Sequence, residues 1–191
     1  MVAETAQLRW PETDIAYYDQ NLSGTAIDGR RIQPCDEIDP DVPIALGIGD
    51  NQARTRIRNY VISKGFDLLL VSHPNCLISP SAEFGPGCFF GPNAIVHTHA
   101  RLGAAVVINS GAIVEHECTL ADTVHIAPGA VLAGSVTVGE QTLIGVGARV
   151  LPGITIGSHA TIAAGAVVTE DIPDHATAIG VPAQIRQPAD E

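Results

Sequence analysis

Two neighbouring side chains, His116 and Glu117, have the clearest capacity for chemistry in this sequence. Histidine titrates near neutral pH, so its ring can accept a proton from an attacking nucleophile. A carboxylate on the Nδ1 atom would fix the tautomer and raise the basicity of the ring. Glu115, on the other side of His116, could take the same part. The segment IVEHEC could therefore form a histidine–carboxylate pair that moves a proton, although a surface histidine without a role is the commoner case, and the choice of carboxylate stays open.

The elements that must position this pair follow a repeat of six residues. Residues 77–172 divide into sixteen hexads without an insertion, with an apolar second residue and a small or β-branched sixth residue in each. A period of six fits neither a helix nor a simple strand, and indicates a short strand followed by a bend. Three hexads close one triangular coil of 18 residues, which predicts a β-helix. On this register Ile126 points inward, Cys88 and Cys118 are small core residues, and Thr123 faces outward, where it should tolerate a charge.

The 18-residue coil fixes which residues lie near His116. Gly134 follows it by 18 residues and should lie one coil beyond, where a backbone N–H without a side chain could stabilise an oxyanion. His125 follows by nine residues, or half a coil, so the two histidines of one chain should lie on different faces. They could then meet only across a subunit interface. Val146 and Ala164 are likewise one coil apart.

Residues 1–72 have a different pattern, which predicts a small, incomplete α/β module of the Rossmann type. The predicted strands are residues 14–18, 42–48 and 66–71, and the predicted helix is residues 50–64. Ligands bind at strand ends in such folds, and the candidates there are Asp19, Gln20, Gly49 and Asp50. The strand and Gly-rich turn that open such modules are expected to be missing. We therefore divide the chain into 1–72, a β-helix at 73–173, and a C-terminal segment and tail at 174–191.

The composition excludes several classes of function. The chain has 10 basic and 21 acidic residues, a net charge of −11, which disfavours nucleic acid and anionic membranes as partners. With 19 Gly, 13 Pro and only 16% charged residues, it favours a β-rich fold over a helical bundle. No apolar run reaches the ~18 residues of a membrane span, no signal peptide is evident, and no CxxC pair occurs. We expect a cytoplasmic protein.

Several segments resemble one family of hexapeptide-repeat acyltransferases, the sugar acetyltransferases that act on nucleotide-linked 4-amino-sugars, with the related sialic acid O-acetyltransferases. These segments are NSGAIVEHECTL, HIAPGAVLAGSVTVG, IGVGARVLPG, IGVPAQ, ALGIGDNQARTRI and SHPNCLISPSA, which span most of the chain. The resemblance implies a left-handed parallel β-helix. It also implies a homotrimer with its sites in clefts between adjacent prisms, and acetyl-CoA lying along the coils as the acetyl donor.

The resemblance assigns roles to individual residues. It implies that His116 is the general base and that Glu117 is the carboxylate that supports it. His125 matches a histidine that contacts the acetyl group, and Val146 and Ala164 match positions whose backbone contacts the coenzyme. Asp19, Gln20, Gly49 and Asp50 resemble nucleotide-contacting positions. Since the family's Gly-rich turn helps to hold the sugar nucleotide, its absence predicts weak binding of that substrate.

The sequence therefore predicts acetyl transfer from acetyl-CoA to the 4-amino group of a nucleotide-linked deoxysugar, by direct attack on the thioester and without a metal. O-acetylation of a sialic-acid-like sugar is the nearest alternative. A zinc lyase of the carbonic anhydrase type, with His97, His99 and His159 as candidate ligands, is a second. A non-catalytic trimeric scaffold is a third.

Overall fold

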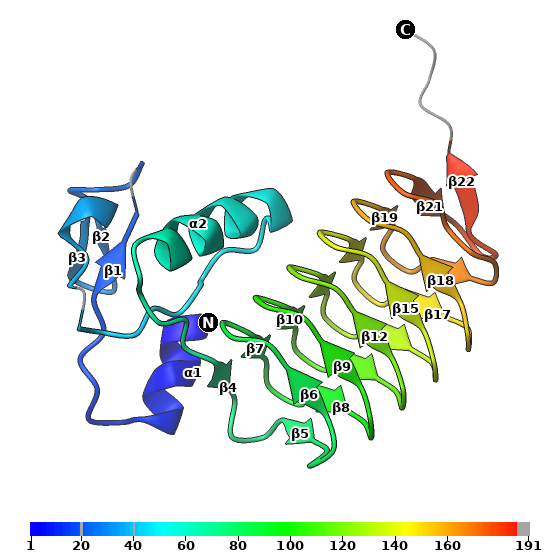
Figure 1. The fold of residues 1–191 in the computed structure, drawn as a ribbon, viewed down its shortest axis with the longest axis horizontal. Coiled ribbons are helices and arrows are strands. Elements are labelled where there is room, and N and C mark those ends of the chain that lie inside the picture. The colour runs from blue at the N-terminus through cyan, green and yellow to red at the C-terminus, as the bar shows by residue number, and fades with distance from the viewer. Residues whose placement is uncertain (20, 40, 187–191) are drawn as a thin grey trace, which may run out of the picture.

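The computed structural model describes residues 1–19, 21–39 and 41–186, which form a small N-terminal unit and a left-handed parallel β-helix (Figure 1). The β-helix has three sheets of short parallel strands. Between β4 and β20, paired residues are 18 apart in the sequence, for example His125 and Leu143. The predicted fold class and the 18-residue coil are thus confirmed.

The strands of each sheet come from every third hexad. The eight-stranded sheet contains β4 (Val71–Ser72), β7 (Phe89–Phe90), β10 (Val107–Ile108), β13 (His125–Ile126), β16 (Leu143–Ile144), β19 (Thr161–Ile162), β21 (Thr177–Ile179) and the antiparallel β22 (Gln184–Arg186). The six-stranded sheet contains β5 (Leu77–Ile78), β8 (Ile95–Val96), β11 (Ile113–Val114), β14 (Val131–Leu132), β17 (Arg149–Val150) and β20 (Val167–Val168). The five-stranded sheet contains β6 (Glu83–Phe84), β9 (Arg101–Leu102), β12 (Thr119–Leu120), β15 (Thr137–Val138) and β18 (Thr155–Ile156).

The core of the β-helix is the inward ladder of second and sixth hexad residues. Ile126 is fully buried, and Cys88 and Cys118 are buried at sixth positions, as expected. Burying one such isoleucine contributes about 1.5–3 kcal/mol relative to leaving it in water. Phe84 departs from the ladder and is 40% exposed, because it lies in the first coil and has the core on one side only.

The N-terminal unit is less regular than predicted. It contains α1 (Val2–Arg9), β1 (Tyr17–Tyr18), β2 (Ala26–Ile27), β3 (Arg30–Gln33), the 3-10 turn η1 (Cys35–Glu37) and α2 (Asn51–Ser63). Of the predicted strands, 14–18 is reduced to β1, whereas 42–48 and 66–71 share only a bridge between Ile44 and Leu68. Each apolar run pairs along only part of its length, so regular pairing ends after one or two residues. No helix in the described ranges is long and apolar enough to cross a membrane.

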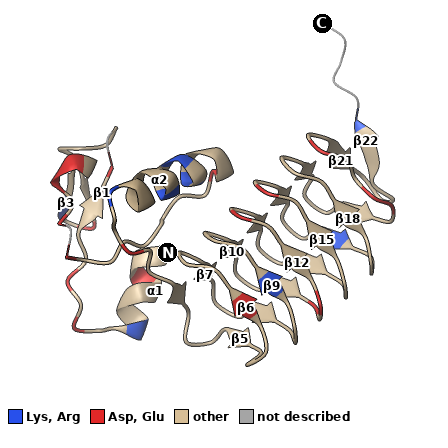
Figure 2. Ribbon diagram, in the orientation of Figure 1, with Lys and Arg blue, Asp and Glu red and all other residues tan. Residues whose placement is uncertain are grey.

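The α2 helix joins the unit to the corner of the β-helix where the five-stranded sheet passes into the eight-stranded one. Asp50 caps its N-terminus by accepting a hydrogen bond from Ala53 N (2.7 Å). The helix carries three arginines, in contrast to the sparse basic residues of the β-helix (Figure 2). The side chain of Thr123 faces this helix, with its Oγ1 3.0 Å from Thr55 Oγ1, and is 1% exposed. The expectation that Thr123 would tolerate a charge is therefore wrong, because α2 covers this corner.

Candidate active site

His116 and Glu117 form the predicted pair at the corner between β11 and β12. The His116 Nδ1 and Glu117 Oε2 atoms lie 3.1 Å apart, and both side chains are more than half exposed. Glu117 has a φ of +61°, and every fifth hexad residue between Gly87 and Gly165 has a positive φ. This left-handed residue turns the chain at the corner and brings the Glu117 carboxylate to the imidazole of its neighbour. An alternating strand would have placed the two side chains on opposite faces.

Glu115, the rival carboxylate, has a different partner. Its Oε1 atom lies 3.7 Å from Nε2 of His97, one coil below. The geometry therefore pairs His116 with Glu117. A carboxylate on Nδ1 leaves Nε2 as the atom with a free lone pair, which is the arrangement that a general base needs.

Gly134 lies directly against the ring of His116, one coil beyond it. A Cβ atom at this position would lie 2.5 Å from both Cε1 and Nε2 of His116, so only glycine leaves room for the ring. The Gly134 N–H donates no hydrogen bond to any described residue. The expected donor for an oxyanion is thus beside the candidate base.

His125 lies on β13 in the eight-stranded sheet, away from the His116 corner, so the expectation of different faces is confirmed. Its Nδ1 atom is 3.2 Å from the Gly49 carbonyl oxygen, and its Nε2 atom is 3.2 Å from Asn109 Nδ2. Burial is the main cause that lowers the pKa of His125, the charge of Arg54 lowers it further, and the Gly49 carbonyl opposes both.

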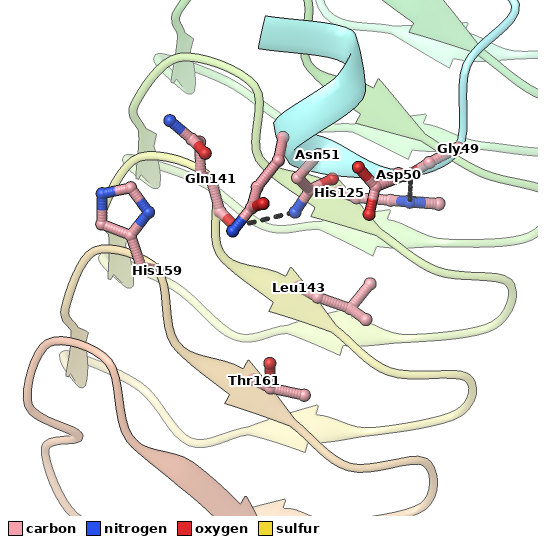
Figure 3. A pocket seen from close by; sticks show the side chains of 9 residues that line it. Gly49, Asp50, Asn51, His125, Gln141, Leu143, His159 and Thr161 are labelled. Atoms are coloured by element: carbon pink, nitrogen blue, oxygen red, sulfur yellow. Dashed lines mark hydrogen bonds between the residues drawn. The ribbon is translucent and has the colours of Figure 1, made fainter.

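A cleft of about 370 Å³ opens between the start of α2 and the eight-stranded sheet (Figure 3). The loop before α2 supplies one wall, and strands β13, β16 and β19 with two adjoining corners supply the other. The lining residues are Gly49, Asp50, Asn51, Gln52, His125, Gln141, Leu143, His159 and Thr161. The structure therefore brings His125, Gly49 and Asp50 together, although Asp50 and His125 are 75 positions apart in the sequence.

A second cavity, of about 820 Å³, lies in the N-terminal unit. Asp19, Tyr17 and Tyr18 line it, and Gly47 and Ile48 belong both to its wall and to the segment that leads into the small cleft. The Asp19 Oδ1 atom accepts hydrogen bonds from the backbone N–H groups of the next turn, at 2.8 and 3.0 Å. Asp19 thus shapes the loop at the end of β1. The candidate Gln20 lies outside the described residues.

Val146 and Ala164 lie one above the other at the corner after β16 and β19. Neither backbone N–H donates a hydrogen bond to a described residue. Two unpaired donors one coil apart suit the amide carbonyls of an extended chain such as the pantetheine arm of coenzyme A. This corner borders the eight-stranded sheet, whereas His116 and Gly134 lie at the next corner.

The histidines considered for zinc have other surroundings. His97 faces Glu115, and the His159 ring stacks on His175 with centroids 4.8 Å apart, at a different corner of the β-helix. Within the part of the chain that the structure describes, no group of three or more His, Cys, Asp or Glu side chains is arranged to hold a metal ion.

Two residues of the site escaped the sequence analysis, Asn109 and Arg54. Asn109 is the residue beside His125 Nε2. Arg54 is fully buried, and its guanidinium donates to backbone carbonyls of both the N-terminal unit and the β-helix. One signal was available, since Arg54 precedes the buried Val61 by seven residues and so shares its helix face.

Comparisons with known proteins agree with this architecture. Residues 135–170 match the family model described as bacterial transferase hexapeptide (six repeats). No curated protein sequence matches the chain. The acetyltransferase domain of PglB from Neisseria gonorrhoeae, also solved in complex with acetyl coenzyme A, is 34% identical with a TM-score of 0.91, and the match covers 97% of this chain and 93% of that one.

Two further solved structures are similar over nearly the whole chain. A mutant of perosamine N-acetyltransferase from Caulobacter crescentus, in complex with CoA and GDP-perosamine, is 35% identical with a TM-score of 0.92, and the match covers 98% of this chain and 91% of that one. WeeI from Acinetobacter baumannii is 26% identical with a TM-score of 0.92, and the match covers 97% of this chain and 93% of that one.

Proposed function

Because this chain belongs to the family of hexapeptide-repeat sugar N-acetyltransferases, which use acetyl-CoA, we propose that it acetylates the 4-amino group of a nucleotide-linked deoxysugar. The observation that carries the proposal is the His116–Glu117 pair, 3.1 Å apart, placed against Gly134 on a fold shared with enzymes of this kind. The full-length match to a structure that contains CoA and GDP-perosamine supports a nucleotide-linked amino-sugar as the acceptor.

In the proposed reaction, His116 acts as the general base. Its Nε2 atom accepts a proton from the sugar amine while the amine nitrogen forms a bond to the acetyl carbon, and the C–S bond of the thioester then breaks. His116 returns the proton to the departing sulfur, so the products are the N-acetylated sugar and coenzyme A thiol. Glu117 keeps Nδ1 protonated and stabilises the imidazolium in between. No acyl-enzyme is formed.

The unpaired backbone donors complete this proposal. The Gly134 N–H stabilises the oxyanion that develops on the acetyl carbonyl, as a fixed dipole does in other acyl transfers. The N–H groups of Val146 and Ala164 hold the pantetheine arm of acetyl-CoA. Tyr17, Tyr18 and the loop shaped by Asp19 line a cavity large enough for a nucleoside, from which Gly49 and Asp50 lead to the small cleft.

The complete site is proposed to form in a homotrimer. His116 and His125 lie on different faces of one chain, so a neighbouring subunit must supply the second histidine if both contact one acetyl group. Mixed trimers test this directly. Subunits with His116→Ala and subunits with His125→Gln are each impaired alone. When equal amounts of the two variants are refolded together, about a quarter of the interfaces would pair an intact His116 with an intact His125. The mixture should then regain about that fraction of the activity of the unchanged protein. No recovery in mixed trimers would contradict a shared site.

The acceptor is tested with matched substrate pairs. Nucleotide-linked sugars with an amine at carbon 4 should release CoA thiol from acetyl-CoA, and the same sugars with a hydroxyl at carbon 4 should not. A sialic-acid-like sugar provides a separate arm for O-acetylation. Turnover of the hydroxyl sugars or of the sialic acid alone would overturn the proposed acceptor, while leaving the family assignment in place.

A further inference from the structure

Arg54 has no role in the proposed chemistry, yet among the described residues it is the largest side chain that is fully buried. Within the described residues, its guanidinium donates to oxygen atoms of backbone and amide groups and to no carboxylate. It donates to the carbonyls of Ile48 (3.0 Å), Gly49 (3.1 Å), Ala105 (2.9 Å) and Thr123 (2.7 Å), and to Asn51 Oδ1 (2.7 Å). Burial lowers the pKa of Arg54 to about 10, which leaves it charged at neutral pH.

The neighbours of His125 determine which ring nitrogen carries the proton. Ser110 N donates to Asn109 Oδ1 at 2.8 Å, which orients the amide so that its NH₂ group faces His125 Nε2. An amide NH₂ can only donate, and the Gly49 carbonyl beside Nδ1 can only accept. His125 is therefore the Nδ1–H tautomer, with its Nε2 lone pair directed to Asn109.

Arg54 contacts the structure on both sides of this histidine. It holds the Gly49 carbonyl that accepts from Nδ1, and it holds the Thr123 carbonyl two residues before His125 in the chain. We propose that Arg54 is a positioning residue that holds His125 as the neutral Nδ1–H tautomer at the acetyl-transfer site, so that His116 remains the only proton acceptor there. The proposal rests on the proposed function for its link to acetyl transfer, but not for the state of the ring.

The charged groups around His125 are consistent with a neutral His125 ring and with His116 as the proton acceptor. Arg54 on α2 disfavours a second positive charge, and Asp50 at the cap of the same helix and His159 across the cleft are the other titratable groups that line the site. The Oδ1 atom of Asp50 accepts a hydrogen bond from the N–H of Ala53, and the Asp50 charge acts on Arg54. Burial and the Arg54 charge therefore disfavour a charged His125 ring, whereas His116 lies 3.1 Å from the Glu117 carboxylate. Such different surroundings suit one histidine to act as a base and the other not.

The state of His125 is measurable without any substrate. Nitrogen-15 NMR of the full-length protein with labelled histidine, with the signal assigned by its loss in His125→Gln, should show an Nδ1–H tautomer at pH 7. In Arg54→Gln the same signal should become a mixture of tautomers, and its titration midpoint should rise. An Nε2–H tautomer or a charged ring in the unchanged protein would overturn the proposal, even if Arg54→Gln failed to fold.

Arg58→Gln is the matched control. Arg58 lies one helical turn further along α2 and also bridges to the β-helix, through Asp122 Oδ2 at 2.7 Å. Its hydrogen bonds to described side chains go to Asp122 and Asn59 rather than to the loop at Gly49. Arg58→Gln should leave the tautomer and the titration of His125 unchanged. If both variants alter the His125 signal alike, Arg54 merely docks the helix and the proposal fails.

Kinetics complete the test. Arg54→Gln should lower kcat by roughly 10-fold to 100-fold, the usual cost of a misplaced group, and should move the acid limb of the kcat profile to higher pH, since a charged His125 then forms more easily. Arg54→Lys keeps the positive charge but loses the several N–H donors of the guanidinium. The titration midpoint of His125 should therefore change less in Arg54→Lys than in Arg54→Gln. The predicted NMR result in a protein that fails to acetylate any amino-sugar would contradict the proposed function alone.

Discussion

The contact between Gly134 and His116 gives the sharpest prediction for a single substitution. Gly134 stands at the fourth position of its hexad, and at that position other hexads carry residues with a Cβ atom, such as Ala104, Ser110 and Pro128. Its φ is not in the left-handed region, so Gly134→Ala fits the backbone. Gly→Ala at a compatible position is neutral or stabilises a protein by about 0.4–1 kcal/mol. We therefore expect Gly134→Ala to fold normally.

The cost should appear at His116. A Cβ atom at position 134 would lie 2.5 Å from the ring, and ordinary contact begins at 3.4 Å, so the ring must move by about 0.9 Å. A misplacement near 1 Å can lower a rate by roughly 10²-fold, which corresponds to about 2.7 kcal/mol in the activation barrier. The expected result is a loss of that order in kcat with little change in the melting temperature, measured by thiol release and by circular dichroism.

A double-mutant cycle separates this steric effect from other causes. If Gly134→Ala acts by displacing the ring, the substitution should cost much less in a His116→Ala background, where the space is empty. Full activity of folded Gly134→Ala would refute the placement of the base. An equal loss in both backgrounds would show that the substitution acts on the oxyanion donor instead.

Three other predictions follow from the same structure. His116→Ala should lower kcat by roughly 10²–10⁴-fold with little change in acetyl-CoA affinity. Glu117→Ala should lower kcat less, because Glu117 only orients and polarises the ring. Steady-state kinetics and a CoA-binding measurement check both, and a larger loss of kcat in Glu117→Ala than in His116→Ala would show that the base is wrongly assigned. Ile126→Asp buries an unpaired charge and should abolish folding. Thr119→Asp should fold, because Thr119 is exposed and pairs in register with Arg101. Equal tolerance of the two substitutions, in expression and circular dichroism, would contradict the hexad register. The pKa of His125 is held below its usual 6.5, so between pH 6.5 and the lower pKa of the folded protein the unfolded chain binds a proton that the folded chain does not. The free energy of unfolding should therefore fall as the pH falls through this range. Urea titrations at several pH values should show this loss in the unchanged protein, and His125→Gln should lack the contribution of His125 to it.

The β-helix could be read from the sequence because its physics is local. Each coil contacts only its neighbours, so a six-residue pattern repeated sixteen times specifies the inward ladder, the coil length and the stacking of Gly134 on His116. The same holds for α2, whose start at the Asp50 cap is a signal within one turn of helix. In the N-terminal unit, residues 42–48 were wrongly expected to form a full strand. An apolar run becomes a strand only where a partner backbone runs beside it, and that is not a local property.

The choice between Glu115 and Glu117 needed the tertiary structure. Both residues adjoin His116, and only the left-handed φ at the corner, set by closure of the triangular coil, turns Glu117 toward Nδ1 and leaves Glu115 to His97.

The neighbours of His125 could also be identified only from the tertiary structure. They depend on how α2 docks against the β-helix, which buries Arg54 and Thr123 and brings Gly49 to a residue 76 positions away. The hexad repeat determines where residues lie along the axis of the β-helix. The packing of α2 against the β-helix depends on contacts between residues far apart in the sequence, which no short sequence pattern predicts.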